Sequence, residues 1–123
     1  MAVNGEKRRL GFKGETLAVK HLKNKGYKIL RRNFRCKSGE IDIIALFGEV
    51  IAFVEVKTRT GDSFGAPSEA VDARRKQRYK NAANYFMYST GRDVNEYIVR
   101  FDIVEVIIAP GGRVINHFEN AFN

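Results

Sequence analysis

The sequence contains one cysteine, two prolines and no tryptophan among its 123 residues. A single cysteine excludes a disulfide within the chain and a metal centre built from several cysteines, and it suits a reducing compartment. Long apolar runs are also missing, since no stretch approaches the ~18 consecutive apolar residues of a membrane span. The first residues, MAVNGEKRRLGFKGE, have no apolar core of signal-peptide length. We therefore expect a cytoplasmic protein with no membrane partner.

The length and the apolar spacing predict one α/β domain. A chain of this size can bury one core, so we expect a single domain over residues 1–123. Helical spacing covers Asn4 to about Lys25, and Ser68 or Asp72 to Ser89. Strand patterns cover Tyr27–Phe34, Ile41–Phe47, Val50–Lys57, Glu96–Ala109 and Val114–Phe118, with a loop over Thr58–Ser68. Gly26 is a plausible end of the first helix, and the link Gly48-Glu49 is typical of a tight hairpin turn.

Positive charge dominates the sequence and is unevenly placed. The formal net charge is +8, and residues 1–37 hold twelve Lys and Arg against two acidic residues. A second cluster, RRKQRYK, runs from Arg74 to Lys80. Such clusters suit a polyanion, most often nucleic acid, although each one alone fits a solvated helix surface equally well. The candidates for phosphate contact are Lys7, Arg8, Arg9, Lys13, Arg59, Arg74, Arg75 and Arg78.

The two clearest strands carry charged residues among their apolar ones. If Gly48-Glu49 is the turn, Asp42 falls opposite Glu55 and Glu40 falls opposite Lys57, and all four share one face. Facing acids destabilise a sheet, but a divalent cation that takes carboxylate oxygens reverses the effect. A lysine beside such an ion can assist the attack of water or stabilise charge on a phosphate. The pattern indicates metal-dependent hydrolysis of a phosphodiester, with ordinary ion pairs on a solvent-facing sheet as the equally open alternative.

Glu15 is a further acid with an unusual setting. It follows Gly14 and borders the apolar stripe of the first predicted helix, which includes Ala18 and Leu22. Gly11 and Gly14 each cost about 1 kcal/mol relative to alanine inside a helix. Glycines beside an acid at the inner edge suggest close packing against a site or ligand. The alternative is that the helix begins only after Gly14.

Five ordered blocks of the sequence resemble known protein families. GEIDIIA followed by FVEVKTR is similar to the D…ExK signature of the PD-(D/E)xK, or restriction-endonuclease-like, nucleases, with Ile41 in place of the proline. The similarity is closer to the YraN-like family of small bacterial proteins. Its shared blocks resemble GxxGE (residues 11–15), GEIDIIA, FVEVKTR, FGAPSEAV (residues 64–71) and INHFENAFN (residues 115–123). The resemblance spans nearly the whole chain and implies a restriction-endonuclease-like α/β domain with a mixed central sheet flanked by helices.

The resemblance also implies roles for particular residues. Asp42 and Glu55 match metal-binding acids, and Lys57 matches the catalytic lysine. Glu15 matches the helix acid that completes the metal shell in Holliday-junction-resolvase-like nucleases. Accessory candidates are Glu40, from the shared face, and Gln77, which matches a downstream polar residue of several branches.

The implied activity is hydrolysis of DNA phosphodiester bonds with Mg²⁺ or Mn²⁺. Branched DNA is a candidate substrate, and a homodimer is expected by analogy with junction-cleaving relatives. The alternative is a nucleic-acid-binding module that keeps the nuclease fold with little or no catalysis. Whether the chain is an enzyme therefore stays open at this point.

Other polar residues are expected to have structural roles. Arg100 and Asp102 lie two apart on a predicted strand and are expected to pair. His117 is expected to lie at the surface or in a pair. Cys36 lies between the basic residues Arg35 and Lys37, but nothing else in the sequence supports nucleophilic chemistry.

Overall fold

The chain forms two long helices and a series of strands in the order that the sequence predicts. The structure is a computed structural model that describes residues 3–60 and 73–122, without the side chains of residues 3–7. Its elements are α1 (Val3–Asn24), β1 (Lys28–Cys36), β2 (Gly39–Phe47), β3 (Val50–Thr60), α2 (Ala73–Ser89), the 3-10 helix η2 (Val94–Glu96), β4 (Ile98–Ala109) and β5 (Gly112–Phe118). The block FGAPSEAV, most of the predicted loop and the expected start of the second helix lie outside the described residues.

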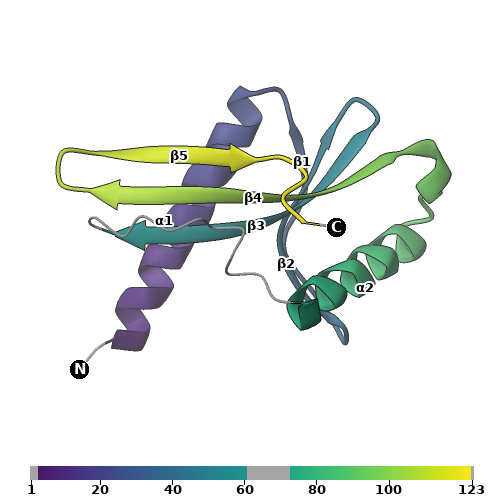
Figure 1. Cartoon of the computed structure of the whole chain (residues 1–123), viewed down its shortest axis with the longest axis horizontal. Coiled ribbons are helices and arrows are strands. Elements are labelled where there is room, and N and C mark those ends of the chain that lie inside the picture. The colour runs from purple at the N-terminus through teal and green to yellow at the C-terminus, as the bar shows by residue number, and fades with distance from the viewer. Residues whose placement is uncertain (1–2, 61–72, 123) are drawn as a thin grey trace.

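The strands form one mixed sheet in the order β1-β2-β3-β4-β5. All neighbours run antiparallel except β3 and β4, which are parallel. Parallel neighbours need a crossover connection, and α2 lies within it. The two helices cover opposite faces of the sheet, with α2 against β2 and β1 (Figure 1). The predicted α/β fold with a mixed sheet flanked by helices is confirmed, and it is consistent with a restriction-endonuclease-like fold.

The sheet separates two apolar cores. On one side Val54 of β3 packs in a cluster with Leu22 of α1. On the other side Phe53 packs edge-on against Phe86 of α2, with ring centroids 6.1 Å apart. Burial of each such side chain contributes about 1.5–3 kcal/mol, so the cores hold both helices on the sheet. Because side chains alternate along β3, its odd-numbered residues face α2 and its even-numbered residues face α1.

Two glycines end or turn the chain where the sequence predicts. Gly26 has φ +99°; its N–H donates to the carbonyl of Lys23, and the N–H of Tyr27 donates to the carbonyl of Leu22. This pattern is a Schellman motif, which favours glycine at the left-handed position. Gly48 has φ +58° in the turn between β2 and β3. The predicted helix end and hairpin turn are therefore confirmed.

The β2–β3 hairpin keeps the predicted register only near its turn. From the turn to Ile43 and Val54 the partners are the predicted ones. Beyond that pair β2 stays with β1, while β3 continues with β4 as far as Thr60. The prediction that Glu40 faces Lys57 is therefore wrong, because Glu40 lies opposite Arg35 of β1. Strand twist separates two strands whose ends are held by different neighbours.

Several predicted element boundaries also need correction. β1 extends to Cys36, and β2 and β5 each begin two residues earlier than predicted. Thr58–Thr60 were predicted as loop but continue β3, because β4 supplies hydrogen-bond partners that the sequence of one strand does not reveal. The strand predicted from Glu96 begins at Ile98 instead. The residues before it form η2, where the side chain of Asp93 accepts a hydrogen bond from the N–H of Asn95.

Candidate functional site

Asp42 lies where β2 separates from β3. Its Oδ2 accepts a hydrogen bond of 2.8 Å from the backbone N–H of Val56. The carboxylate therefore satisfies a backbone donor at the point where the β2–β3 ladder has ended. The prediction that Asp42 stands opposite Glu55 in a continuous ladder is therefore wrong. Instead, the side chain of Asp42 bridges the gap between the two strands.

The surroundings of Asp42 disfavour its charged form. Burial is the main cause that raises the pKa of Asp42 from 3.8 to about 7, against the opposing effect of the Val56 N–H. Three other carboxylates, those of Glu15, Glu55 and Glu40, raise this pKa as well. Each of these three acids is thus within electrostatic range of Asp42. A bound cation would favour the charged form of Asp42 and reverse this effect.

Glu55 is buried on the α2 side of β3, with 1% of its surface exposed. Its Oε1 lies 3.3 Å from Nζ of Lys57 and also forms an ion pair with the guanidinium of Arg75 on α2. Neither carboxylate oxygen accepts a hydrogen bond from a described residue. A buried carboxylate without hydrogen bonds is costly, and the two positive side chains offset part of that cost.

Glu15 approaches the same region from α1. Its Oε1 lies 3.8 Å from Nη2 of Arg32 and accepts no hydrogen bond from a described residue. Burial is the main cause that raises the pKa of Glu15, while Arg32 and a hydrogen bond from Asn33 lower it. Because α1 continues through Gly14, the alternative in which the helix begins after that glycine is wrong. The first helix therefore presents an acid toward Asp42.

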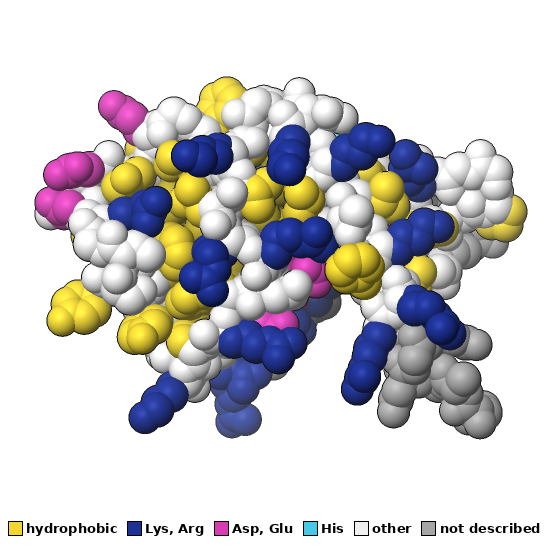
Figure 2. Space-filling view, turned by 180° about the vertical axis from the view of Figure 1, so that it is seen from behind, with side chains coloured by type: hydrophobic (Ala, Val, Ile, Leu, Met, Phe, Trp, Pro, Cys, Tyr) yellow, Lys and Arg dark blue, Asp and Glu magenta, His cyan; other side chains and the backbone are white. Residues whose placement is uncertain are grey.

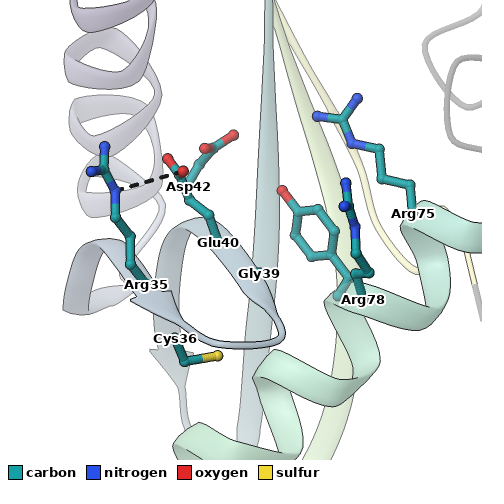
Figure 3. A pocket seen from close by; sticks show the side chains of 8 residues that line it. Arg35, Cys36, Gly39, Glu40, Asp42, Arg75 and Arg78 are labelled. Atoms are coloured by element: carbon teal, nitrogen blue, oxygen red, sulfur yellow. Dashed lines mark ion pairs between the residues drawn. The ribbon is translucent and has the colours of Figure 1, made fainter.

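A pocket of about 550 Å³ lies beside Asp42, between the β1–β2 turn and the start of α2 (Figure 3). Arg75 and Arg78 extend toward it from α2, and Arg35 pairs with Glu40 across its rim at 3.6 Å. This volume is in the range of small-ligand sites, so a group of nucleotide size can enter. The pocket, called the Asp42 pocket below, is lined by Arg35, Cys36, Gly39, Glu40, Asp42, Arg75, Arg78 and Tyr79.

Tyr79 of α2 lines the pocket but was not among the site residues predicted from the sequence. Its ring packs edge-on against Phe122, with centroids 5.6 Å apart. Burial is the main cause that raises the pKa of Tyr79, and the carboxylates of Asp42 and Glu55 raise it as well. The phenol therefore stays protonated and can only donate or accept a hydrogen bond as a neutral group.

Glu105 of β4 is a second buried acid that the sequence analysis missed. It stands beside Lys57 in the parallel β3–β4 register. Its Oε2 lies 3.3 Å from Nε of Arg59, and its Oε1 accepts a hydrogen bond of 3.1 Å from Asn116. Glu105 carries the same signal as Glu55, an acid inside an apolar strand, and that signal could have identified it. Arg59, a candidate for phosphate contact, is thereby held against the sheet.

The acids have the chemistry of a site for a hard divalent cation. Both oxygens of Glu55 and one of Glu15 lack hydrogen-bond partners among the described residues, and Asp42 lies within electrostatic range of both side chains. Carboxylate oxygens are the ligands that Mg²⁺ takes. Within residues 3–60 and 73–122, no three His, Cys, Asp or Glu side chains converge closely enough to hold an ion as they stand. The donor set fits a cation, and enclosing one requires side-chain movement.

The other candidate residues are more scattered. Gln77 is exposed and donates a hydrogen bond of 3.0 Å to Asn81 of the same helix. Of the two accessory candidates, Glu40 lines the Asp42 pocket and Gln77 does not. The side chain of Lys7 lies outside the described residues. Exposed basic candidates on the two helices are Arg8, Arg9, Lys13, Arg74, Arg75 and Arg78.

Basic side chains spread over the surface of the molecule on the α1 side of the sheet. Figure 2 shows Lys and Arg side chains distributed across this face, with few acidic ones between them. Such a surface attracts polyanions over a distance set by the ionic strength. In the part of the chain that the structure describes, neither helix is long and apolar enough to cross a membrane.

Taken together, the mixed sheet and its two covering helices place the chain in the class of α/β domains consistent with a restriction-endonuclease-like fold. The sequence model of "Uncharacterised protein family UPF0102" matches residues 14–106. The chain is 44% identical over 115 residues to a UPF0102 protein of Alkaliphilus oremlandii, which covers 94% of this chain and 98% of the relative. It is 47% identical over 119 residues to one of Caldanaerobacter subterraneus, with 94% and 96% covered. The chain belongs to the UPF0102 family, and the resemblance to the YraN-like family is thereby confirmed.

Proposed function

We propose that the protein is a Mg²⁺- or Mn²⁺-dependent endonuclease that hydrolyses DNA phosphodiester bonds, with branched DNA as its candidate substrate. One observation carries the proposal. Asp42 brings a half-buried carboxylate and Glu55 a buried one to the gap between two separating strands, beside Lys57, and neither oxygen of Glu55 accepts a hydrogen bond from a described residue. Neither strand pairing nor core packing needs such an arrangement, whereas a cation-dependent reaction does.

Each residue then has a chemical role. Asp42 and Glu55 would hold the cation, and Glu15 would complete its ligands from α1. When bound, the cation would neutralise negative charge on the reacting phosphate and activate the attacking water. Lys57, with 17% of its side chain exposed, keeps a positive charge where the transition state gains negative charge.

The basic surface supports nucleic acid as the partner. Contacts to phosphates position a protein on DNA and release counterions, which makes the affinity depend on salt. Exposed cations on α1 and α2 and the arginines of the Asp42 pocket are suited to such contacts. We place the protein in the cytoplasm, and we include a homodimer in the proposal by analogy with junction-cleaving nucleases.

A second candidate function is nucleic-acid binding without catalysis. The ion pair between Arg75 and Glu55 favours it, because two positive side chains already neutralise Glu55. A binding module would need the basic surface and the fold, but not a free carboxylate. Binding measurements alone would therefore not distinguish the two candidates.

Cleavage of linear, flapped and four-way DNA over a range of Mg²⁺ and Mn²⁺ concentrations distinguishes them. The nuclease proposal expects cleavage by the wild type and a loss of at least about 100-fold in Glu55→Ala and Lys57→Met. In Ca²⁺, which we expect to support binding without cleavage, Glu55→Ala should still bind DNA. Lys57→Met should keep its metal affinity, because the lysine is not a ligand. Glu49→Ala removes an exposed acid from the hairpin turn and serves as the matched control.

Equal background activity in the wild type and Glu55→Ala, on every substrate, would refute the nuclease proposal. The binding module would then be the better account. Cleavage by Glu55→Ala at the rate of the Glu49→Ala control would show that any activity comes from another site.

A further inference from the structure

Arg75 connects α2 to the most deeply buried acid of the candidate site. Its guanidinium pairs with Oε1 of Glu55, the same oxygen that lies 3.3 Å from Nζ of Lys57. Glu55 is almost completely buried, but 47% of the Arg75 side chain is exposed. A ligand arriving from solvent therefore meets Arg75 before it meets Glu55.

The ion pair and a bound cation compete for the same carboxylate. A divalent ion held by Asp42 and Glu55 would lie beside the guanidinium of Arg75. Like charges this close repel, and burial strengthens the repulsion because little water screens it. Binding of the cation therefore requires Arg75 to move away from Glu55.

The Asp42 pocket offers Arg75 an alternative to Glu55. Arg75 and Arg78 are three residues apart on α2, a spacing that puts both on one face of the helix. Both reach toward the pocket beside Asp42 (Figure 3). A guanidinium binds a phosphate through two parallel hydrogen bonds, so a phosphate in this pocket is a strong alternative to Glu55.

We propose that Arg75 exchanges Glu55 for a phosphate of the nucleic acid, and that this exchange couples metal binding to nucleic-acid binding. Without nucleic acid, Arg75 holds Glu55 and weakens metal binding. With nucleic acid, Arg75 binds the phosphate and leaves Glu55 to the metal. The inference rests on the proposed function, since it needs a metal and a phosphate at this site. The coupling is reciprocal, so the metal must strengthen nucleic-acid binding by the same factor.

The test compares the wild type with Arg75→Gln and Arg74→Gln. Arg74 is the neighbouring exposed residue of α2, so Arg74→Gln removes the same charge without removing the pair with Glu55. Calorimetry gives the Ca²⁺ and Mn²⁺ affinities of each protein alone. Fluorescence anisotropy gives the affinity for a labelled four-way DNA junction with and without saturating Ca²⁺, and circular dichroism checks folding. Glutamine and methionine are both favourable in helices, so Arg75→Met is a second variant with the same expectation.

We expect Arg75→Gln to bind Ca²⁺ about tenfold more tightly than the wild type. Arg74→Gln should match the wild type in Ca²⁺ affinity, and any loss of junction affinity from removing a phosphate contact should be the same with and without Ca²⁺. Ca²⁺ should tighten junction binding by about tenfold in the wild type and in Arg74→Gln, but by less than about twofold in Arg75→Gln. Equal Ca²⁺ affinity in all three proteins, with equal effects of Ca²⁺ on junction binding, overturns the exchange and leaves the proposed metal site standing. Absence of Ca²⁺ and Mn²⁺ binding in all three proteins overturns both.

Discussion

Replacing Gly14 by alanine should destabilise the protein, whereas replacing Gly11, three residues earlier on α1, should stabilise it. A Cβ atom at Gly14 would lie 1.9 Å from Oγ1 of Thr58 and 2.9 Å from its Cβ and Cγ2. Rotation of the Thr58 side chain moves Oγ1 and Cγ2 but not Cβ, so it cannot remove every close contact. A Cβ atom at Gly11 would have nothing within 4 Å.

The two effects differ in sign because one is steric and the other is conformational. Overpacking this severe costs about 3 kcal/mol, at the upper end of the usual range. The better helix propensity of alanine returns about 1 kcal/mol, so Gly14→Ala should lose about 2 kcal/mol and Gly11→Ala should gain about 1 kcal/mol. This difference of about 3 kcal/mol corresponds to roughly 10–15 °C in Tm for a domain of this length.

Urea unfolding followed by circular dichroism measures both free energies of unfolding, and thermal unfolding provides the Tm. The double variant Gly14→Ala with Thr58→Ala should recover part of the loss, because it removes the two rotatable side-chain atoms. If Gly14→Ala proved as stable as Gly11→Ala, the close packing of α1 on β3 would be wrong. The position of Glu15 beside Asp42 depends on that packing, so it would be in error too.

Three further predictions concern pH, a buried ion pair and salt. The pKa of Asp42 is about 7 in the folded protein and near 3.8 in the unfolded chain. The protonated acid therefore contributes stability that is fully present below pH ~4 and is lost as the pH rises through 7. Urea unfolding should show a lower free energy of unfolding at pH 8 than at pH 5 in the wild type, and Asp42→Asn should lack this decline. Asp102→Ala should lower the free energy of unfolding by about 3–5 kcal/mol in the same assay, because it leaves Arg100, whose Nη2 lies 2.8 Å from the carboxylate, without this partner. The control Asp93→Ala, at an exposed position, should lower it by only about 1 kcal/mol. DNA affinity should fall steeply with added salt, and Arg78→Gln should lower the slope of log affinity against log salt by about 1 for all sequences alike; an unchanged slope would place Arg78 away from phosphates.

Local patterns in the sequence were enough to predict most elements and part of the hairpin. Helical spacing and Gly26 predicted α1 and its end, because both depend on interactions within one or two turns. The link Gly48-Glu49 predicted the register of β2 and β3 near their turn, since a two-residue turn leaves one choice of partners. Alternation then placed Glu55 and Lys57 on the same face. These features depend on residues that are close together along the chain.

The expected pairing of Arg100 with Asp102 is also confirmed, but its extent needed the fold. Oδ2 of Asp102 accepts a hydrogen bond from Arg100 and also lies 2.7 Å from Nε2 of His117 on β5. The sequence predicted only that His117 would lie at the surface or pair with another side chain. The burial of this pair becomes evident only when β5 pairs with β4 and the two strands pack into the fold, where the His117 side chain is 2% exposed.

The tertiary structure alone decided how the candidate site is assembled. The sequence pattern predicted that the β2–β3 pairing continues through Asp42. In the structure β3 pairs with the parallel strand β4 there, and the carboxylate of Asp42 accepts a hydrogen bond from the N–H of Val56 instead. Arg75 looked like one cation of a surface cluster, yet the docking of α2 on the sheet pairs it with Glu55. Contacts of this kind join residues that are distant in sequence, and their geometry depends on how whole elements pack. The residue types of the site and the shared face of Glu55 and Lys57 were therefore readable from the sequence, while the distances and partners were set by the fold.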